Sequence, residues 1–473
     1  MKSFYLMAPV LACSILLAAP NSDPSADSFF PYAVEKVTLD NGLDILIIEM
    51  PEFKDVLSYN TMVLAGGRSE TEKGKTGFAH LFEHIMFQHS YKGEPGGYRA
   101  AINNLGAHNN GWTWYDITYY HPLTFTSKLG PQNDGMGAMG PGLLELEASR
   151  FMDLNYDEAI FKRETGAVMG EYRNNASNPG GALNEKRLGL MFPNHSYGHR
   201  VIGTYDDIVD MPQQYEYSKW FYDTYYRPNN CVIVVAGDIR KDEVVPLLRE
   251  AFAAWEYQEV PPIDVADPPQ TEEYRGEVEW DADVPPRISV AHKGPEYVTG
   301  SKASAVGQII SELVTSNSAP LYKKLRFVKG TASSLGMSGP DSFDRYVINL
   351  SARLYSGQYK ERGAEYLKSV EADMVAGLDD LKSFASSPDA GHVLDMVKSK
   401  FKYDFLAELN SPAHVAQQLA WYYRFERDPD VIDKLMASVQ ALTPVDIENF
   451  AKEYFVASNR TVVTLTPKPK EGE

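Results

Sequence analysis

Cysteine is almost absent from this sequence: there are two in 473 residues, Cys13 and Cys231. If the first residues are removed as a leader, only Cys231 remains, so an intrachain disulfide is excluded. A cysteine-based zinc site is excluded for the same reason. Any metal ion must then be held by histidine and carboxylate side chains. Cys231 opens an apolar run and is predicted to be a small buried residue.

Beyond the first 26 residues, no apolar run is long enough to cross a membrane. The N-terminus itself carries Lys2, then a mostly apolar stretch over residues 4–19, then small residues. This pattern predicts a signal peptide over residues 1–26 and export across the inner membrane, with the periplasm as destination. A lipid anchor at Cys13 is the alternative.

Positive charge is scarce. The chain has 45 Lys and Arg against 64 Asp and Glu, a formal net charge of -19. Such an acidic chain is a poor match for nucleic acid or an anionic membrane surface. The length and a 44% share of hydrophobic residues predict two or three domains with large cores.

A hairpin is predicted around Asn41-Gly42, between strands over residues 34–39 and 43–48. The first half further predicts strands over residues 57–65, 112–121 and 232–236, helices over 76–88, 143–152 and 156–174, and a surface loop over 126–142. The second half predicts strands over residues 288–292 and 346–352 and helices over 304–314 and 319–327.

The two halves end alike. Residues 206–236 and 444–465 each run from an Asp-Ile helix through an aromatic helix end and an asparagine turn to a β-branched strand. Duplication of one α+β domain is therefore predicted, each copy a mostly antiparallel sheet with helices on one face. The expected boundaries are 27–258 for the first domain, 259–277 for a proline-rich acidic linker, and 278–473 for the second domain.

The chemistry is concentrated in His80-Leu81-Phe82-Glu83-His84. On a helix His80 and His84 lie one turn apart on the same face, so both imidazoles can reach one ion. Zinc accepts histidine nitrogen and carboxylate oxygen, and a catalytic site keeps a position open for water. Glu83, beside His84, is the predicted general base. The His-x-x-Glu-His order is that of the inverted zinc peptidase motif.

A third ligand must come from another segment. Glu164 and Glu171 lie seven residues apart, two turns along one face of the predicted helix over 156–174. One of them can bind the ion, and the other can fix a ligand from behind. The spacing alone does not say which.

At this point the chain resembles the pitrilysin-like M16 family of zinc peptidases, in the short two-domain bacterial form related to mitochondrial processing peptidase. The resemblance covers nearly all of the mature chain. Its carriers are residues 76–84, Asn110-Gly111-Trp112-Thr113, Arg163-Glu164, Gly170-Glu171, Tyr197-Gly198, and 225–230 leading to Gly237-Asp238. The resemblance implies zinc on His80, His84 and Glu171, with Glu83 as base and Glu164 as a supporting catalytic carboxylate.

The resemblance also implies how a substrate is held. The edge strand that begins near Asn110 and Trp112 would pair with an extended, unfolded peptide. Arg326 matches the arginine that the family's second domain places near the substrate. The tyrosine expected seven residues later is Ser333 here. The implied partner is therefore a second M16-like chain that carries both the arginine and the tyrosine.

Two functions follow. The first is a zinc-dependent endopeptidase that cleaves unfolded peptides as the metal-bearing subunit of a heterodimer. The alternative is a non-catalytic scaffold or assembly subunit of the same family, which the intact His80, Glu83 and His84 disfavour and the missing tyrosine favours.

Overall fold

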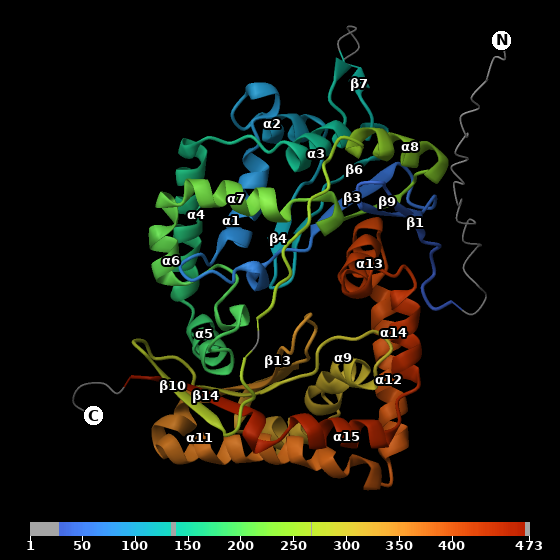
Figure 1. Ribbon diagram of the computed structural model, residues 1–473. Helices are drawn as coiled ribbons and strands as arrows, with labels where there is room; N and C mark the ends of the chain where they lie inside the picture. Colours follow the sequence, from blue (N-terminus) through green and yellow to red (C-terminus); the bar gives the residue numbers. More distant parts are fainter. Residues whose placement is uncertain (1–27, 134–138, 266, 469–473) are drawn as a thin grey trace, which may run out of the picture.

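The structure is a computed structural model that describes residues 28–133, 139–265 and 267–468. The predicted signal peptide over residues 1–26, with Cys13, lies outside these residues. The chain forms two α+β halves, with α5 and α13 reaching from one half toward the other (Figure 1). Among the described residues, no helix combines the length and the apolar composition needed to cross a membrane.

The first sheet has the strand order β1-β2-β9-β3-β5-β4, with β6 also paired to β3. Its strands are β1 (Glu35–Thr38), β2 (Asp44–Glu49), β3 (Val56–Val63), β4 (Gly111–Thr113), β5 (Thr118–Tyr120), β6 (Leu123–Phe125) and β9 (Cys231–Gly237). Only β2 and β9 run parallel. The predicted hairpin is confirmed, because β1 and β2 pair in antiparallel fashion across the Asn41-Gly42 turn.

The second sheet repeats this plan in the order β10-β14-β11-β13-β12. Its strands are β10 (Tyr274–Trp280), β11 (Arg287–Lys293), β12 (Ala332–Ser338), β13 (Val347–Leu354) and β14 (Arg460–Pro467). Its parallel pair is β10 and β14, which correspond to β2 and β9 of the first sheet. The order β2-β9-β3-β5-β4 therefore corresponds strand for strand to the second sheet, and the edge strands β4 and β12 are equivalent.

The helices follow the same division. The first half contributes α1 (Phe78–Ile85), α2 (Gly97–Asn104), α3 (Leu143–Met152), α4 (Glu158–Ala176), α5 (Pro179–Met191), α6 (Tyr205–Asp210), α7 (Tyr215–Tyr225) and α8 (Lys241–Phe252). The second half contributes α9 (Lys302–Thr315), α10 (Pro320–Lys323), α11 (Ser356–Asp379), α12 (Ala390–Glu408), α13 (Pro412–Glu426), α14 (Val431–Gln440) and α15 (Pro444–Tyr454).

Both faces of the first sheet are buried, because strand residues alternate between two cores. Ile45 and Ile47 pack with the residues of α1, whereas Leu46 and Ile48 belong to a core made largely by the second half. Helix α13 lies against β3 and β9 on that second face, and α5 in turn lies on β10 and β14 of the other sheet. The expectation of helices on one face only therefore holds within each half but not in the whole chain.

Several predicted elements differ from the structure. Residues 112–121 form two strands, β4 and β5, because a tight turn closes with the Trp114 amide donating to the Ile117 carbonyl. Strand β10 begins at Tyr274, inside the stretch predicted as a linker. The predicted loop over 126–142 contains a two-stranded ladder, β7 (Gln132–Asn133) with β8 (Met139–Gly140). Helices α5 and α11 to α14 were not predicted.

Candidate metal centre

Helix α1 carries the histidine motif and begins in an unusual way. Its N-cap residue is Gly77, with φ 90°, which has no side chain to accept hydrogen bonds from the first turn. Glu70 supplies the acceptor instead: the Gly77 amide donates to Oε2 at 2.8 Å and the Ala79 amide to Oε1 at 2.7 Å. The sequence offers one clue, since a helix starting on glycine needs a cap from elsewhere.

His80 and His84 present their Nε2 atoms to one carboxylate. Glu171, reaching from α4, places Oε2 3.4 Å from His80 Nε2 and Oε1 3.6 Å from His84 Nε2. The two ring centroids are 5.0 Å apart. One ligand atom from each of the three side chains lies within 4.8 Å of the others. No other group of three or more His, Cys, Asp or Glu in the described part of the chain meets this geometry.

Glu164 approaches His84 from the opposite side of the ring. Its Oε2 lies 3.7 Å from His84 Nδ1, and its Oε1 accepts a hydrogen bond from Arg163 Nε at 3.0 Å. Glu164 is buried, whereas the Glu171 side chain is 47% exposed. A carboxylate at the ring nitrogen that does not bind the metal orients the histidine, whereas a carboxylate beside the metal-binding nitrogens can be a ligand of the same ion. The structure therefore separates the two glutamates that the sequence left equivalent.

Glu83 lies beside this group without belonging to it. Its Oε2 is 4.0 Å from His80 Nε2 and accepts a hydrogen bond from the Thr113 hydroxyl at 2.7 Å. Burial raises the pKa of Glu83, with the Thr113 hydrogen bond and His84 acting in the opposite direction. A carboxylate that is held in place and has a raised pKa can take up and return a proton.

The donor set fits a zinc ion. Tetrahedral zinc with ligands at about 2.0–2.2 Å separates its ligand atoms by roughly 3.4 Å, close to the distances from Glu171 to the two rings. Burial lowers the pKa of His80 to about 3, which keeps that ring neutral as a metal ligand must be. Burial also lowers the pKa of His84, but Glu164, Glu171 and Glu83 outweigh it and raise the value. Zinc would therefore compete with a proton at His84.

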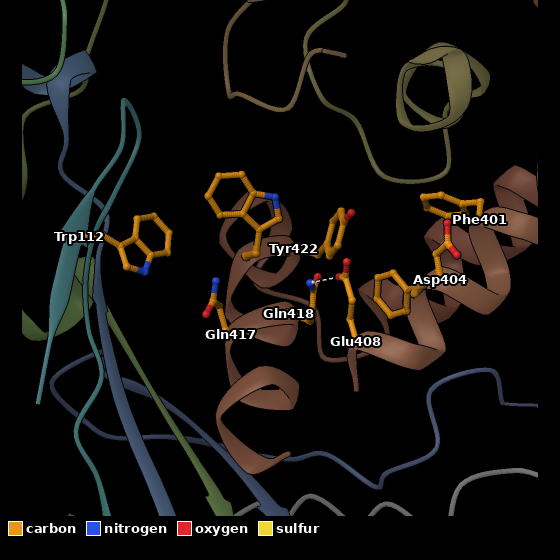
Figure 2. A pocket seen from close by; sticks show the side chains of 9 residues that line it. Trp112, Phe401, Asp404, Glu408, Gln417, Gln418 and Tyr422 are labelled. Carbon is orange, nitrogen blue, oxygen red and sulfur yellow. Dashed lines mark hydrogen bonds between the residues drawn. The ribbon is translucent and has the colours of Figure 1, made fainter. Parts of the chain in front are cut away.

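The predicted substrate residues Asn110 and Trp112 lie at the free edge of the first sheet. Strand β4 pairs only with β5 among the described residues. Asn110 is exposed and its Oδ1 accepts a hydrogen bond from the Gly111 amide. Trp112 points away from Glu83, since its neighbour Thr113 contacts that carboxylate. Figure 2 shows Trp112 facing side chains of α12 and α13 across a cavity of about 420 Å³.

Arg326 belongs to the second half and lies in a π-helical turn over Lys324–Val328. Its Nη1 donates to the Ala332 carbonyl at 2.8 Å, and its guanidinium lies over the Tyr322 ring. No described contact joins it to the metal-site residues.

Ser333 lies at a β-bulge in β12, with its hydroxyl donating to the Arg353 carbonyl. Tyr355, the N-cap residue of α11, lines the same cavity as Ser333, so a phenol is present there from another element.

Two family models match the chain. "Insulinase (Peptidase family M16)" covers residues 47–205, which include both glutamates and the histidine motif, and "Peptidase M16 inactive domain" covers residues 214–382. Together they span well over half of the chain.

Relatives extend the match. The zinc protease PqqE of Helicobacter pylori is 26% identical over 473 residues, which are 99% of this chain and 100% of the relative. Mitochondrial-processing peptidase subunit beta of Homo sapiens is 25% identical over 188 residues, 40% of this chain and 36% of the relative. The crystal structure of a protease from Helicobacter pylori has a TM-score of 0.79 at 25% identity, covering 92% and 100% of the two chains. The chain belongs to peptidase family M16.

Proposed function

We propose that this protein is a zinc-dependent endopeptidase that cleaves unfolded peptides. The observation that carries the proposal is the convergence of His80, His84 and Glu171 on one point, with Glu83 beside it. The relative named a zinc protease matches this chain from end to end. A scaffold subunit would have no need for this donor set.

The protein's own residues account for the chemistry. When bound by His80, His84 and Glu171, zinc supplies Lewis-acid activation of water and of the scissile carbonyl. Glu83 takes a proton from the attacking water and returns it to the leaving amine. The Thr113 hydroxyl holds Glu83 Oε2, the carboxylate oxygen that lies 4.0 Å from His80 Nε2, in place beside the ligand atoms. Glu164 holds the His84 ring in place through Nδ1.

Strand β4 supports peptides as the substrate class. It joins the general base to a free sheet edge, because Thr113 is both a β4 residue and the partner of Glu83. An extended peptide can add to such an edge through main-chain hydrogen bonds, which do not depend on sequence. Most chain segments of a folded protein already pair their main-chain groups within the fold, whereas an unfolded segment leaves them free for β4, so unfolded segments are the expected substrates.

Glu83→Gln tests the proposal. The amide keeps the shape and the Thr113 contact but cannot accept a proton, so kcat is expected to fall by about 10²–10⁴-fold. Zinc content, measured by mass spectrometry of the purified protein, is expected to stay near one ion per chain.

Glu250→Gln, on the exposed face of α8, is the matched control. Equal cleavage by Glu83→Gln and the parent would show that the base is assigned wrongly. A parent without bound zinc would favour the scaffold alternative.

We also propose that the chain acts in the periplasm as the metal-bearing subunit of a heterodimer. Export is supported by the apolar leader over residues 1–26. A second chain is supported by Ser333 in place of tyrosine and by similarity to a relative named as a subunit. Fractionation of cells that express the full chain tests the compartment, and retention in the cytoplasm with an intact leader would contradict it.

A further inference from the structure

A second cavity, of about 500 Å³, lies between α5 and the second sheet. We call it the arginine cavity, because Arg187 from α5, Arg287 from β11 and Arg353 from β13 line it. The other polar side chains around it are Asn184, Asn349, Ser334 and Ser351. No aspartate or glutamate is among its lining residues in the described part of the chain. Three positive charges thus share one cavity in a protein with a net charge of -19.

Arg287 and Arg353 are direct cross-strand partners in the β11–β13 ladder. Like charges in that position repel and destabilise a sheet. Burial lowers the pKa of Arg287, and the charge of Arg353 lowers it further. The Arg287 Nε atom is buried without a hydrogen-bond acceptor. This pair is therefore unfavourable in the protein alone.

The start of α5 adds to the positive potential. Gly180 lines the cavity in the first turn of α5, where the helix dipole is positive. Arg287 Nη1 lies 2.6 Å from where a β-carbon on Gly180 would be. A side chain at this position would displace the Arg287 guanidinium, which here lies against the positive end of a helix.

Arg187 is the most buried of the three, at 8% exposure. It donates one hydrogen bond, to Asn184 Oδ1, but its Nε is buried without an acceptor and burial lowers its pKa. No ion pair of Arg187 occurs among the described residues. Leaving a buried charge unpaired is costly. By contrast, the fully buried Arg150 is paired with Glu147 at 2.6 Å.

The arginine cavity is connected to the metal centre by a short piece of chain. Glu171 and Gly180 are separated by the last turn and a half of α4 and a short link, which places their Cα atoms on the order of 20 Å apart at most. An extended peptide advances about 3.3 Å per residue, so roughly six residues would span that distance. A substrate held at the metal centre can therefore reach the cavity.

We propose that the arginine cavity binds carboxylates of the peptide substrate, within about six residues of the cleaved bond. The inference rests on the proposed peptidase function and names the substrate class as acidic peptides. Guanidinium groups pair with carboxylates through two parallel hydrogen bonds, and these bonds would satisfy the buried Nε atoms. The carboxylates come from aspartate or glutamate side chains or from the peptide's C-terminus.

The test measures binding in the Glu83→Gln protein, so that the result does not depend on cleavage. The probes are fluorescein-labelled peptides with four glutamates, identical peptides with glutamines, and each of these with a free or an amidated C-terminus. Fluorescence anisotropy is expected to show at least about tenfold tighter binding of the glutamate peptide than of the glutamine peptide, or of the free C-terminus than of the amidated one. This difference in affinity should decrease as salt is raised. The first comparison reports on side-chain carboxylates and the second on the C-terminal carboxylate.

Arg287→Gln with Arg353→Gln, introduced together into Glu83→Gln, is expected to reduce that preference at least about fivefold. Because the change removes a repulsive pair, the midpoint of thermal unfolding should not fall, which shows that the fold is kept. Arg240→Gln with Arg249→Gln, on exposed positions before and in α8, gives the same change of net charge as a control. No preference for carboxylates, or an equal loss in the control, would overturn the proposal. Whether the parent cleaves the glutamine peptide reports separately on the peptidase function.

Discussion

At the scale of single residues, two glutamates on one helix face the same histidine from opposite sides. Glu171 meets Nε2 of both rings, whereas Glu164 meets Nδ1 of His84. The seven-residue spacing brings both glutamates to the site but does not show which is the ligand and which supports His84. The assignment depends on the depth at which α4 packs against α1, which is a tertiary property.

This difference predicts two distinct effects on zinc binding. Glu164→Gln keeps all three ligand atoms but weakens the support of His84, so zinc affinity should fall by about 10–100-fold. Glu171→Gln removes a charged ligand, so the loss should be larger. Chelator competition measures both constants. With zinc in excess, Glu164→Gln should recover most of its activity and Glu171→Gln should not.

Glu158→Gln, at the exposed first turn of α4, serves as the control and should bind zinc like the parent. If Glu164→Gln lost more affinity than Glu171→Gln, the two roles would have to be exchanged.

Single residues can be predicted from the sequence where their grouping lies in a local pattern. His80, Glu83 and His84 are readable because helical periodicity alone puts them together. Glu70 and Arg187 are not, because each acquires its role from partners that the sequence does not mark. The arginine cavity draws its members from α5, β11 and β13, and no motif connects them.

At the scale of elements, the free edge of β4 makes a prediction about the substrate backbone. In an added antiparallel strand, only alternate residues direct their N–H and C=O groups toward the partner strand. N-methylation of successive amides in a good substrate should therefore raise KM in an alternating pattern, by about fivefold for each hydrogen bond lost. Steady-state kinetics on the methylated series measure this. A uniform effect at all positions would mean that the peptide does not bind as a strand.

The β4–β5 hairpin shows why some elements resist prediction. Apart from Asp116 and His121, residues 112–121 are aromatic or β-branched, and no glycine or proline marks a turn. The turn forms because Asp116 is held by the Tyr197 hydroxyl at 2.6 Å and by the Phe343 amide at 3.1 Å. Both partners are distant in sequence. By contrast, α3 occupies residues 143–152 as predicted, because its helical pattern is complete within the segment.

At the scale of the whole molecule, the two halves share one topology but differ in what they carry. Edge strand β4 lies beside the general base, whereas the equivalent strand β12 has a β-bulge at Ser333. Bulges re-aim side chains and are frequent beside functional sites. The second half thus repeats the sheet plan of the first, with Ser333 at the position where the family resemblance leads one to expect a tyrosine.

The final prediction concerns this missing group. If a partner chain supplies the tyrosine, Ser333→Tyr should make the isolated chain more active, raising kcat/KM for an unfolded peptide by about tenfold, as expected for one or two added hydrogen bonds to the substrate. Ser387→Tyr, at an exposed position before α12, is the control and should give no gain. Zinc content should be equal in both variants, so that a difference in activity reflects substrate contact.

Light scattering should show whether the parent associates only when the second chain is added. Full activity of the parent as a monomer, with no gain from Ser333→Tyr, would show that Tyr355 or another residue already performs the task and that no partner is required.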